Sequence, residues 1–168
     1  WRVGDCPNVV YFKRNEHFQA QQFLWEDCIN WGNHKDHGGG RSVMLAALRI
    51  LFILGLRRVY LLGVDFTMNE HSKYHFEQDR SRASIAGNNA TYQKLSRWLG
   101  ELRPLFEEQD FQVFNCNPNS NLEVFDILPY EEAVRRVRHE FGDIDVRCER
   151  TKGLYETSTK EKQAGGEK

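Results

Sequence analysis

Apolar residues recur along this chain in two patterns, and the alternation between them predicts the order of strands and helices. Short continuous runs rich in β-branched and aromatic residues lie at 8–13 (NVVYFK), 58–63 (RVYLLG) and 111–115 (FQVFN). Apolar runs of this length without regular alternation are typical of buried parallel strands. We therefore predict three strands that lie parallel in one sheet.

Between and after these runs, apolar residues follow helical spacing instead. We predict helices over 16–31, over 42–54 with Gly55 as its C-terminal cap, from Asn88 or Asn89 to Phe106, and over 130–141 after Pro129. The helix 42–54 is apolar on most sides and should be buried on most sides. Alternating strands and helices predict an open α/β sandwich with a mostly parallel sheet.

The most apolar stretch, residues 43–56, could be mistaken for a membrane span. It holds 14 residues, whereas a span needs roughly 20, and Arg49 lies inside it. We therefore predict a buried helix and no integral membrane segment. Because a buried guanidinium is costly unless it is paired, we expect Arg49 to meet a carboxylate or to extend its head group to the surface.

Composition bounds the class of protein. The chain has 168 residues, about one domain, and its 40% hydrophobic content is enough to bury a core. Its 23 basic and 24 acidic residues give a net charge of −1, which argues against nucleic-acid binding. From Glu149 onward few residues are apolar. We predict a single α/β domain over 1–148 and a flexible tail over 149–168.

The compartment is predicted from cysteines and the first residues. The four cysteines form no CxxC pair, and the N-terminal residues lack the basic and apolar regions of a signal peptide. Both features favour the reducing environment of a cytoplasmic protein. Because the sequence opens on Trp1, we expect a fragment or a processed chain.

Candidate chemistry begins at the glycine-rich turn before the helix 42–54. Gly39 and Gly40 allow the backbone to approach a ligand, and Arg41 and Ser42 add a charge and a hydroxyl. A helix N-terminus presents unpaired N–H groups to an anion. We predict anion binding here, with close packing of the glycines as the alternative.

Further polar groups follow the strand 58–63. Asp65 can cap a turn, hold a ribose hydroxyl or bind a metal ion, and Thr67 comes two residues later. In the loop that follows, His75 is the candidate general base and Tyr74 a candidate binding residue. A zinc site from His71, His75 and Asp65 has little support from their spacing, so no metal site is predicted.

A second strand end carries Asn117 and Ser120, which can bind the polar edge of a ligand or simply form a turn. Cys116 beside them is interpreted as a buried thiol, because no neighbour in the sequence would activate it. Ligands of open parallel sheets bind at the carboxyl ends of the strands. We therefore expect Gly40, Ser42, Asp65, His75 and Asn117 to converge on one cleft.

Two sequence stretches resemble known families. The stretch 37–68, HGGGRSVMLAALRILFILGLRRVYLLGVDFTM, resembles bacterial lipooligosaccharide sialyltransferases and a family of proteins that includes an archaeal hydroxymethylpterin pyrophosphokinase. The stretch 114–125, FNCNPNSNLEVF, resembles the sialyltransferase strand that ends in a Cys-Pro-Asn-Ser-like turn. The likeness covers about residues 37–126 and consists of short motifs.

The resemblance implies a three-layer Rossmann-like sandwich that binds a nucleotide phosphate at the turn before the helix. It assigns Gly39, Gly40 and Ser42 to the phosphate, and Asp65 and Thr67 to the loop after the strand. The N-terminal glycine-rich nucleotide loop of the sialyltransferases is missing from this sequence, and two further differences stand out. An aromatic residue stands there in place of Thr67, and their catalytic histidine corresponds to residues 84–88, which here read SIAGN.

The leading hypothesis is therefore a glycosyltransferase-like enzyme that uses a nucleotide-activated sugar. Arg41 and the helix N–H groups would stabilise the departing phosphate, and His75 would deprotonate the acceptor. The alternatives are a pyrophosphokinase-like transferase with Mg²⁺ held by Asp65 and a non-catalytic Rossmann-like module. The expected partner is a nucleotide sugar or another nucleotide, and self-association stays open.

Overall fold

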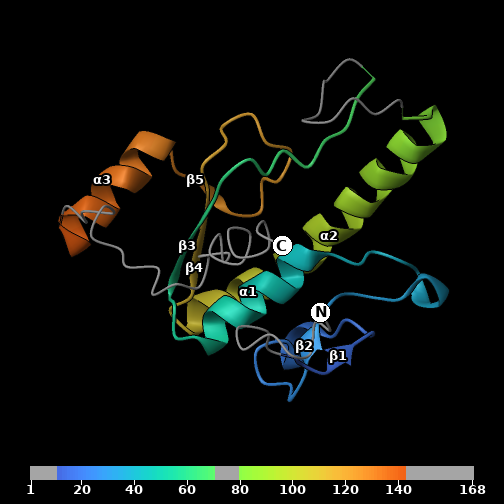
Figure 1. Cartoon of the computed structure of the whole chain (residues 1–168), viewed down its shortest axis with the longest axis horizontal. Coiled ribbons are helices and arrows are strands. Elements are labelled where there is room, and N and C mark those ends of the chain that lie inside the picture. The colour runs from blue at the N-terminus through green and yellow to red at the C-terminus, as the bar shows by residue number, and fades with distance from the viewer. Residues whose placement is uncertain (1–10, 71–79, 143–168) are drawn as a thin grey trace, which may run out of the picture. The chain divides into compact units, whose positions relative to one another are not determined.

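The computed structural model describes residues 11–70 and 80–142, in which strands and helices are interspersed (Figure 1). Their order is β1 (Arg14–Asn15), η2 (Ala20–Gln22), β2 (Ile29–Asn30), η3 (Lys35–His37), α1 (Val43–Ile53), β3 (Arg58–Leu61), α2 (Arg82–Glu108), β4 (Gln112–Asn115), β5 (Asp126–Ile127) and α3 (Tyr130–Phe141). The described residues fall into two units that divide after Ala133. The predicted boundary at residue 148 lies outside the described residues.

Three parallel strands form the main sheet, in the order β3-β4-β5. The register of β3 and β4 runs from Arg58 opposite Gln112 to Leu61 opposite Asn115. The predicted parallel pairing of the runs 58–63 and 111–115 is therefore confirmed, and so is the α/β class. β5 was not predicted, because two residues are too few to give a period.

The predicted strand 8–13 is wrong over residues 11–13, which form no strand, and residues 8–10 lie outside the described residues. The next two residues, Arg14 and Asn15, pair in parallel with Ile29 and Asn30 in a separate two-stranded sheet. The Ile29 N–H also donates to the Lys13 carbonyl over 2.7 Å. This segment therefore does not share the main sheet.

The predicted helix over 16–31 is also wrong, and asparagine side chains give the reason. The amides of His17, Phe18 and Gly32 donate to the side-chain oxygens of Asn15, Asn33 and Asn30 respectively. Such bonds offer the backbone an alternative to the helical ladder. The helical structure in this region is limited to the short 3₁₀ turn η2, and Ala20, Phe23 and Leu24 in and beside it are buried.

α1 forms as predicted, because a polar cap precedes a run that is apolar except for Arg49. The Ser42 Oγ accepts from the Met44 N–H over 3.1 Å, and the chain leaves the helix at Gly55, where φ is +83°. α1 and α2 run in the opposite direction to β3 and β4 (Figure 1). Both helices contribute to one apolar core, which includes Leu45, Leu48, Phe52, Leu95, Leu99, Leu102, Phe106, Phe111 and Val113.

α2 begins earlier than predicted, at Arg82, with the Ser81 Oγ accepting from the Ser84 N–H over 3.2 Å. Asn88 and Asn89 therefore lie inside the helix and do not cap it, and both side chains contact Met68. Pro104 lies inside the helix, which continues to Glu108. α3 begins after Pro129 as predicted. No helix within 11–70 and 80–142 has the length and apolar character that a membrane crossing requires.

Arg49 meets neither of the two expectations for it. Its side chain is buried in α1, only 6% of the residue is exposed, and Nη2 donates to the backbone carbonyl of Glu26 over 2.9 Å. Nε is buried and has no hydrogen-bond partner in the described structure. Burial lowers the pKa of the guanidinium, and the nearby charges of Glu26 and Cys28 oppose that shift.

Replacing Arg49 with methionine should therefore change the free energy of unfolding by no more than about 1 kcal/mol. The lost hydrogen bond to Glu26 is offset because a buried, unpartnered N–H is removed, and each effect is worth about 1–3 kcal/mol. Urea denaturation of the Arg49→Met variant measures the change. A loss above about 3 kcal/mol would mean that the carboxylate of Glu26 holds the guanidinium as an ion pair.

Candidate functional site

The loops that follow β3 and β4 meet at the carboxyl ends of these strands. Asn117 Nδ2 donates to Asp65 Oδ1 over 2.5 Å, and Ser120 Oγ donates to the Val64 carbonyl over 2.6 Å. The backbone N–H of Asn121 donates to the Asp65 carbonyl over 2.9 Å. The structure therefore brings Asp65, Asn117 and Ser120 together.

A buried asparagine folds the loop after β4 into this position. Asn115 is fully buried, its Nδ2 donates to the Leu122 carbonyl over 3.2 Å, and its Oδ1 accepts from the Asn117 N–H over 3.1 Å. The Ser120 Oγ also accepts from the Leu122 N–H over 3.0 Å. These bonds close the turn that presents Asn117 and Asn121.

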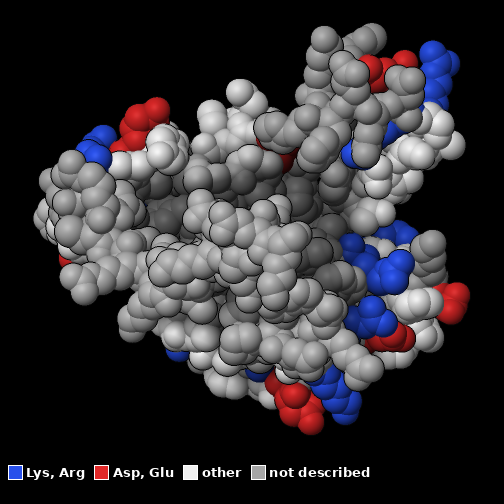
Figure 2. Space-filling view, in the orientation of Figure 1, with Lys and Arg blue, Asp and Glu red and all other residues white. Residues whose placement is uncertain are grey.

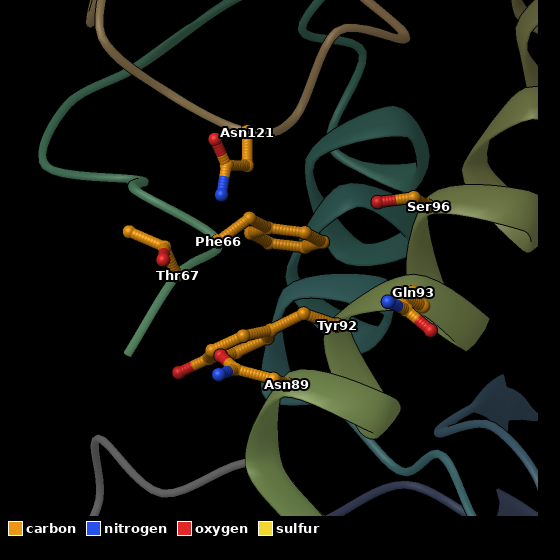
Figure 3. A pocket seen from close by; sticks show the side chains of 7 residues that line it. All are labelled: Phe66, Thr67, Asn89, Tyr92, Gln93, Ser96 and Asn121. Carbon is orange, nitrogen blue, oxygen red and sulfur yellow. The ribbon is translucent and has the colours of Figure 1, made fainter. Parts of the chain in front are cut away.

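Beside this junction lies a pocket of about 320 Å³. Its walls come from the loop after β3, from α2 and from the loop after β4 (Figure 3). A pocket at the strand ends of a parallel sheet is a common site for a small ligand. The lining residues are Phe66, Thr67, Asn89, Tyr92, Gln93, Ser96 and Asn121.

Phe66 lies at the centre of the pocket in an unusual backbone conformation. Its φ is +54°, in the left-handed region that side-chain-bearing residues rarely adopt. The ring stacks on Tyr92 with centroids 5.1 Å apart and an interplanar angle of 28°. Figure 3 shows the Phe66 ring between Asn121 on one side and Tyr92 on the other. Backbone strain of this kind gathers at ligand sites.

Asn89 ties α2 to the loop that carries Phe66 and Thr67. Its Nδ2 donates to the Met68 carbonyl and its Oδ1 accepts from the Met68 N–H, each over 2.9 Å. The carboxamide thus pairs with both backbone groups of one residue. Asn89 therefore fixes the shape of the pocket.

Replacing Asn89 with alanine should lower the free energy of unfolding by about 1–2 kcal/mol, because both bonds to Met68 are lost at a half-buried position. Chemical denaturation measures the loss. The matched control is Asn88→Ala, which removes only a weak contact from Nδ2 to the Met68 sulfur. Equal losses in the two variants would contradict the role given to Asn89.

The pocket lining is polar and uncharged. The side chains of Thr67, Gln93, Ser96 and Asn121 make no hydrogen bond within the described part of the chain. Carboxamides and hydroxyls both donate and accept, so they suit a ligand rich in hydroxyl or amide groups. Among residues 11–70 and 80–142, no group of three or more His, Cys, Asp or Glu side chains is placed to hold a metal ion. Mg²⁺ binding by Asp65 stays a prediction.

The glycine-rich turn lies on a different side of α2. A Cβ at Gly40 would lie 2.6 Å from the Trp98 ring, and Lys94 Nζ donates to the Gly38 carbonyl. At about 3.6 residues per turn, Lys94 and Trp98 are on roughly the opposite side of α2 from Asn89 and Ser96. Close packing therefore accounts for the glycine at position 40.

The remaining groups of the turn are engaged locally. The Ser42 N–H donates to the Trp31 carbonyl over 2.8 Å, and its hydroxyl caps α1. Gly39 has a φ of +71°, and Arg41 bridges to Gly32. The structure thus shows Gly39, Gly40, Arg41 and Ser42 as one turn, away from the pocket that Thr67 lines.

The remaining residues that the sequence suggested lie outside the described part of the chain or are buried. His71, Tyr74 and His75 lie outside the described residues. Cys116 is buried, as expected, and burial raises the pKa of its thiol, which disfavours the nucleophilic thiolate. On the face shown in Figure 2, basic and acidic side chains are interspersed, in keeping with the net charge of −1.

Most of the pocket residues were not predicted from the sequence. Tyr92, Gln93, Ser96 and Asn121 were not among the residues predicted for the site. One signal was available, because Asn89, Gln93 and Ser96 form a stripe of uncharged polar residues at helical spacing beside Tyr92. Comparison of the chain with protein-family models, curated proteins and solved structures gives no match.

Proposed function

We propose that this domain binds a nucleotide-activated sugar at the strand-end pocket and acts as a glycosyltransferase-like enzyme. The proposal includes a three-layer Rossmann-like sandwich. Support for the second face of the sheet comes from a small apolar cluster around Tyr60 and Phe114, whose rings stack 5.6 Å apart. This cluster is separate from the main core, as side chains that alternate across strands require.

The pocket itself is the observation that carries the proposal. Four uncharged side chains with free donors and acceptors surround a stacked aromatic pair at the carboxyl ends of parallel strands. Sugars present hydroxyls to such donors and acceptors and apolar C–H faces to aromatic rings. A site of this composition suits the sugar or nucleoside part of a donor.

Among the described residues, Asp65 is the candidate catalytic group beside the pocket. It directly precedes Phe66, and Asn117 holds one of its carboxylate oxygens. A carboxylate fixed in this way can orient a ligand hydroxyl and accept its proton. The predicted base His75 belongs to the same proposal, although it lies outside the described residues.

The test is a thermal-shift screen of the chain with nucleotides and nucleotide sugars, with and without Mg²⁺. A ligand at about 100 times its dissociation constant should add about 2.7 kcal/mol of stability. The same ligand should stabilise Gln93→Ala less, while the control Asn119→Ala, on an exposed turn residue, should respond like the original chain. Absence of any shift with every nucleotide and nucleotide sugar would contradict the proposal.

A product assay then separates an enzyme from a non-catalytic binding module. The chain is incubated with the nucleotide sugar that stabilises it most, and release of free nucleotide is followed over time. Turnover that Asp65→Asn abolishes supports a transferase. Stabilisation without turnover, with or without Mg²⁺ and with a broad set of sugar acceptors, supports the binding module.

A further inference from the structure

The pocket can accommodate some sugars better than others, because its described walls carry no charge. Two of the seven lining residues, Phe66 and Tyr92, are aromatic. The other five carry carboxamide or hydroxyl groups. The Asn89 carboxamide is already bonded to Met68. Gln93, Ser96, Thr67 and Asn121 remain to contact a ligand, and Figure 3 shows them on different sides of the aromatic pair.

Among the described residues, no Lys or Arg side chain lines the pocket. Arg80 is the described cation beside it, and its Nη1 is engaged with the Met68 sulfur over 3.3 Å. The Lys94 ammonium donates to the Gly38 carbonyl on the other side of the helix. Arg97, one turn after Gln93, is exposed and does not line the pocket. The charge nearest in sequence to Phe66 is the carboxylate of Asp65, which is bonded to Asn117.

A carboxylated sugar would therefore be disfavoured. Moving a carboxylate out of water without a cationic partner is costly, and a second carboxylate nearby adds repulsion. A neutral sugar offers only hydroxyls, which carboxamides and hydroxyls satisfy. Its apolar face can lie against the Phe66–Tyr92 pair.

We propose that the pocket takes a neutral sugar and discriminates against uronic and sialic acids. This inference rests on the proposed function and names the substrate class of the same site. It also departs from what the resemblance to sialyltransferases implies, because a sialyl donor carries a carboxylate.

The experiment is calorimetric titration of the full 168-residue chain with matched ligands. UDP-glucose is compared with UDP-glucuronic acid, GDP-mannose with GDP-mannuronic acid, and CMP-sialic acid, UDP and GDP are added. The neutral member of the pair that binds should bind about tenfold more tightly, or better, since the carboxylate lacks a partner. Gln93→Ala should weaken the neutral sugar nucleotide severalfold and leave the free nucleotide unchanged.

Two variants test whether the charge of the pocket lining decides which sugar binds, and circular dichroism verifies that both are folded. Ser96→Lys brings a cation into the pocket lining. It should reduce or reverse the difference in affinity between the neutral and the carboxylated sugar nucleotide. Arg97→Ala, on the exposed surface one residue away, should leave it unchanged. Equal affinity for both members of a pair, or tight binding of CMP-sialic acid that depends on Gln93, would overturn the inference and leave the proposed function intact. Failure of every nucleotide sugar to bind would overturn both.

Discussion

Replacing Gly40 with alanine is expected to lower the free energy of unfolding by about 2–5 kcal/mol. One part of this loss is the left-handed backbone, with φ at +85°, which costs an L-residue about 1–2 kcal/mol. The other part is a clash, because the new Cβ would lie 2.6 Å from the Trp98 ring. Overpacking of this kind costs about 1–3 kcal/mol.

Gly38→Ala is the matched control for this prediction. Gly38 also has a positive φ, +97°, but a Cβ there would meet nothing within 4 Å. The control should therefore lose only the backbone part, about 1–2 kcal/mol. Urea denaturation of both variants gives the two values. Equal losses would mean that the turn does not pack on Trp98, and the close-packing account of Gly40 would fail.

The second large effect is expected at Asn115, whose replacement by alanine should cost about 2–4 kcal/mol. The substitution leaves the Asn117 N–H and the Leu122 carbonyl without the bonds that the buried carboxamide supplies. Because these bonds shape the loop that carries Asn117 and Asn121, ligand affinity should fall as well. Denaturation and titration of Asn115→Ala measure the two effects.

Asn119 provides the control in the same loop. It is exposed, and in the described structure only its backbone N–H is bonded, to Asn117 Oδ1. Asn119→Ala should therefore change stability by less than about 0.5 kcal/mol. A stable Asn115→Ala variant with unchanged affinity would contradict the role of Asn115 in forming the site.

The parts of the fold that the sequence predicted well are those with strong local signals. α1 is an apolar run, interrupted only by Arg49, between the Ser42 cap and Gly55, and α3 begins after Pro129. The runs that became β3 and β4 were bounded by changes in polarity, so their positions were accurate within two residues. In each case the residues that decide the element lie within it or beside it.

The prediction of a helix over 16–31 was wrong because the conformation of this region depends on partners elsewhere in the chain. Phe18, Trp25 and Ile29 have helical spacing, but the Phe18 N–H bonds to Asn33, fifteen residues away. Spacing alone contains no information about such bonds. The same applies to Arg49, whose partner is a backbone carbonyl that no pattern of charges could predict.

The candidate site was predictable only in part, for a similar reason. The rule that ligands bind at strand ends led to Asp65, Asn117 and Thr67, which the structure places beside or in a pocket. It did not predict that α2 would supply one wall of the pocket, because Asn89 joins the helix to the loop by pairing with the Met68 backbone. A glycine-rich turn suggested anion binding, whereas the packing of Trp98 explains Gly40.

The most direct test of the central claim is a crystal structure of the chain with the nucleotide sugar that stabilises it most. We expect the sugar to lie in the pocket against the Phe66–Tyr92 pair, within hydrogen-bonding distance of Gln93 and Asn121. A ligand bound at the turn 39–42, on the other side of α2, with the pocket empty would contradict it.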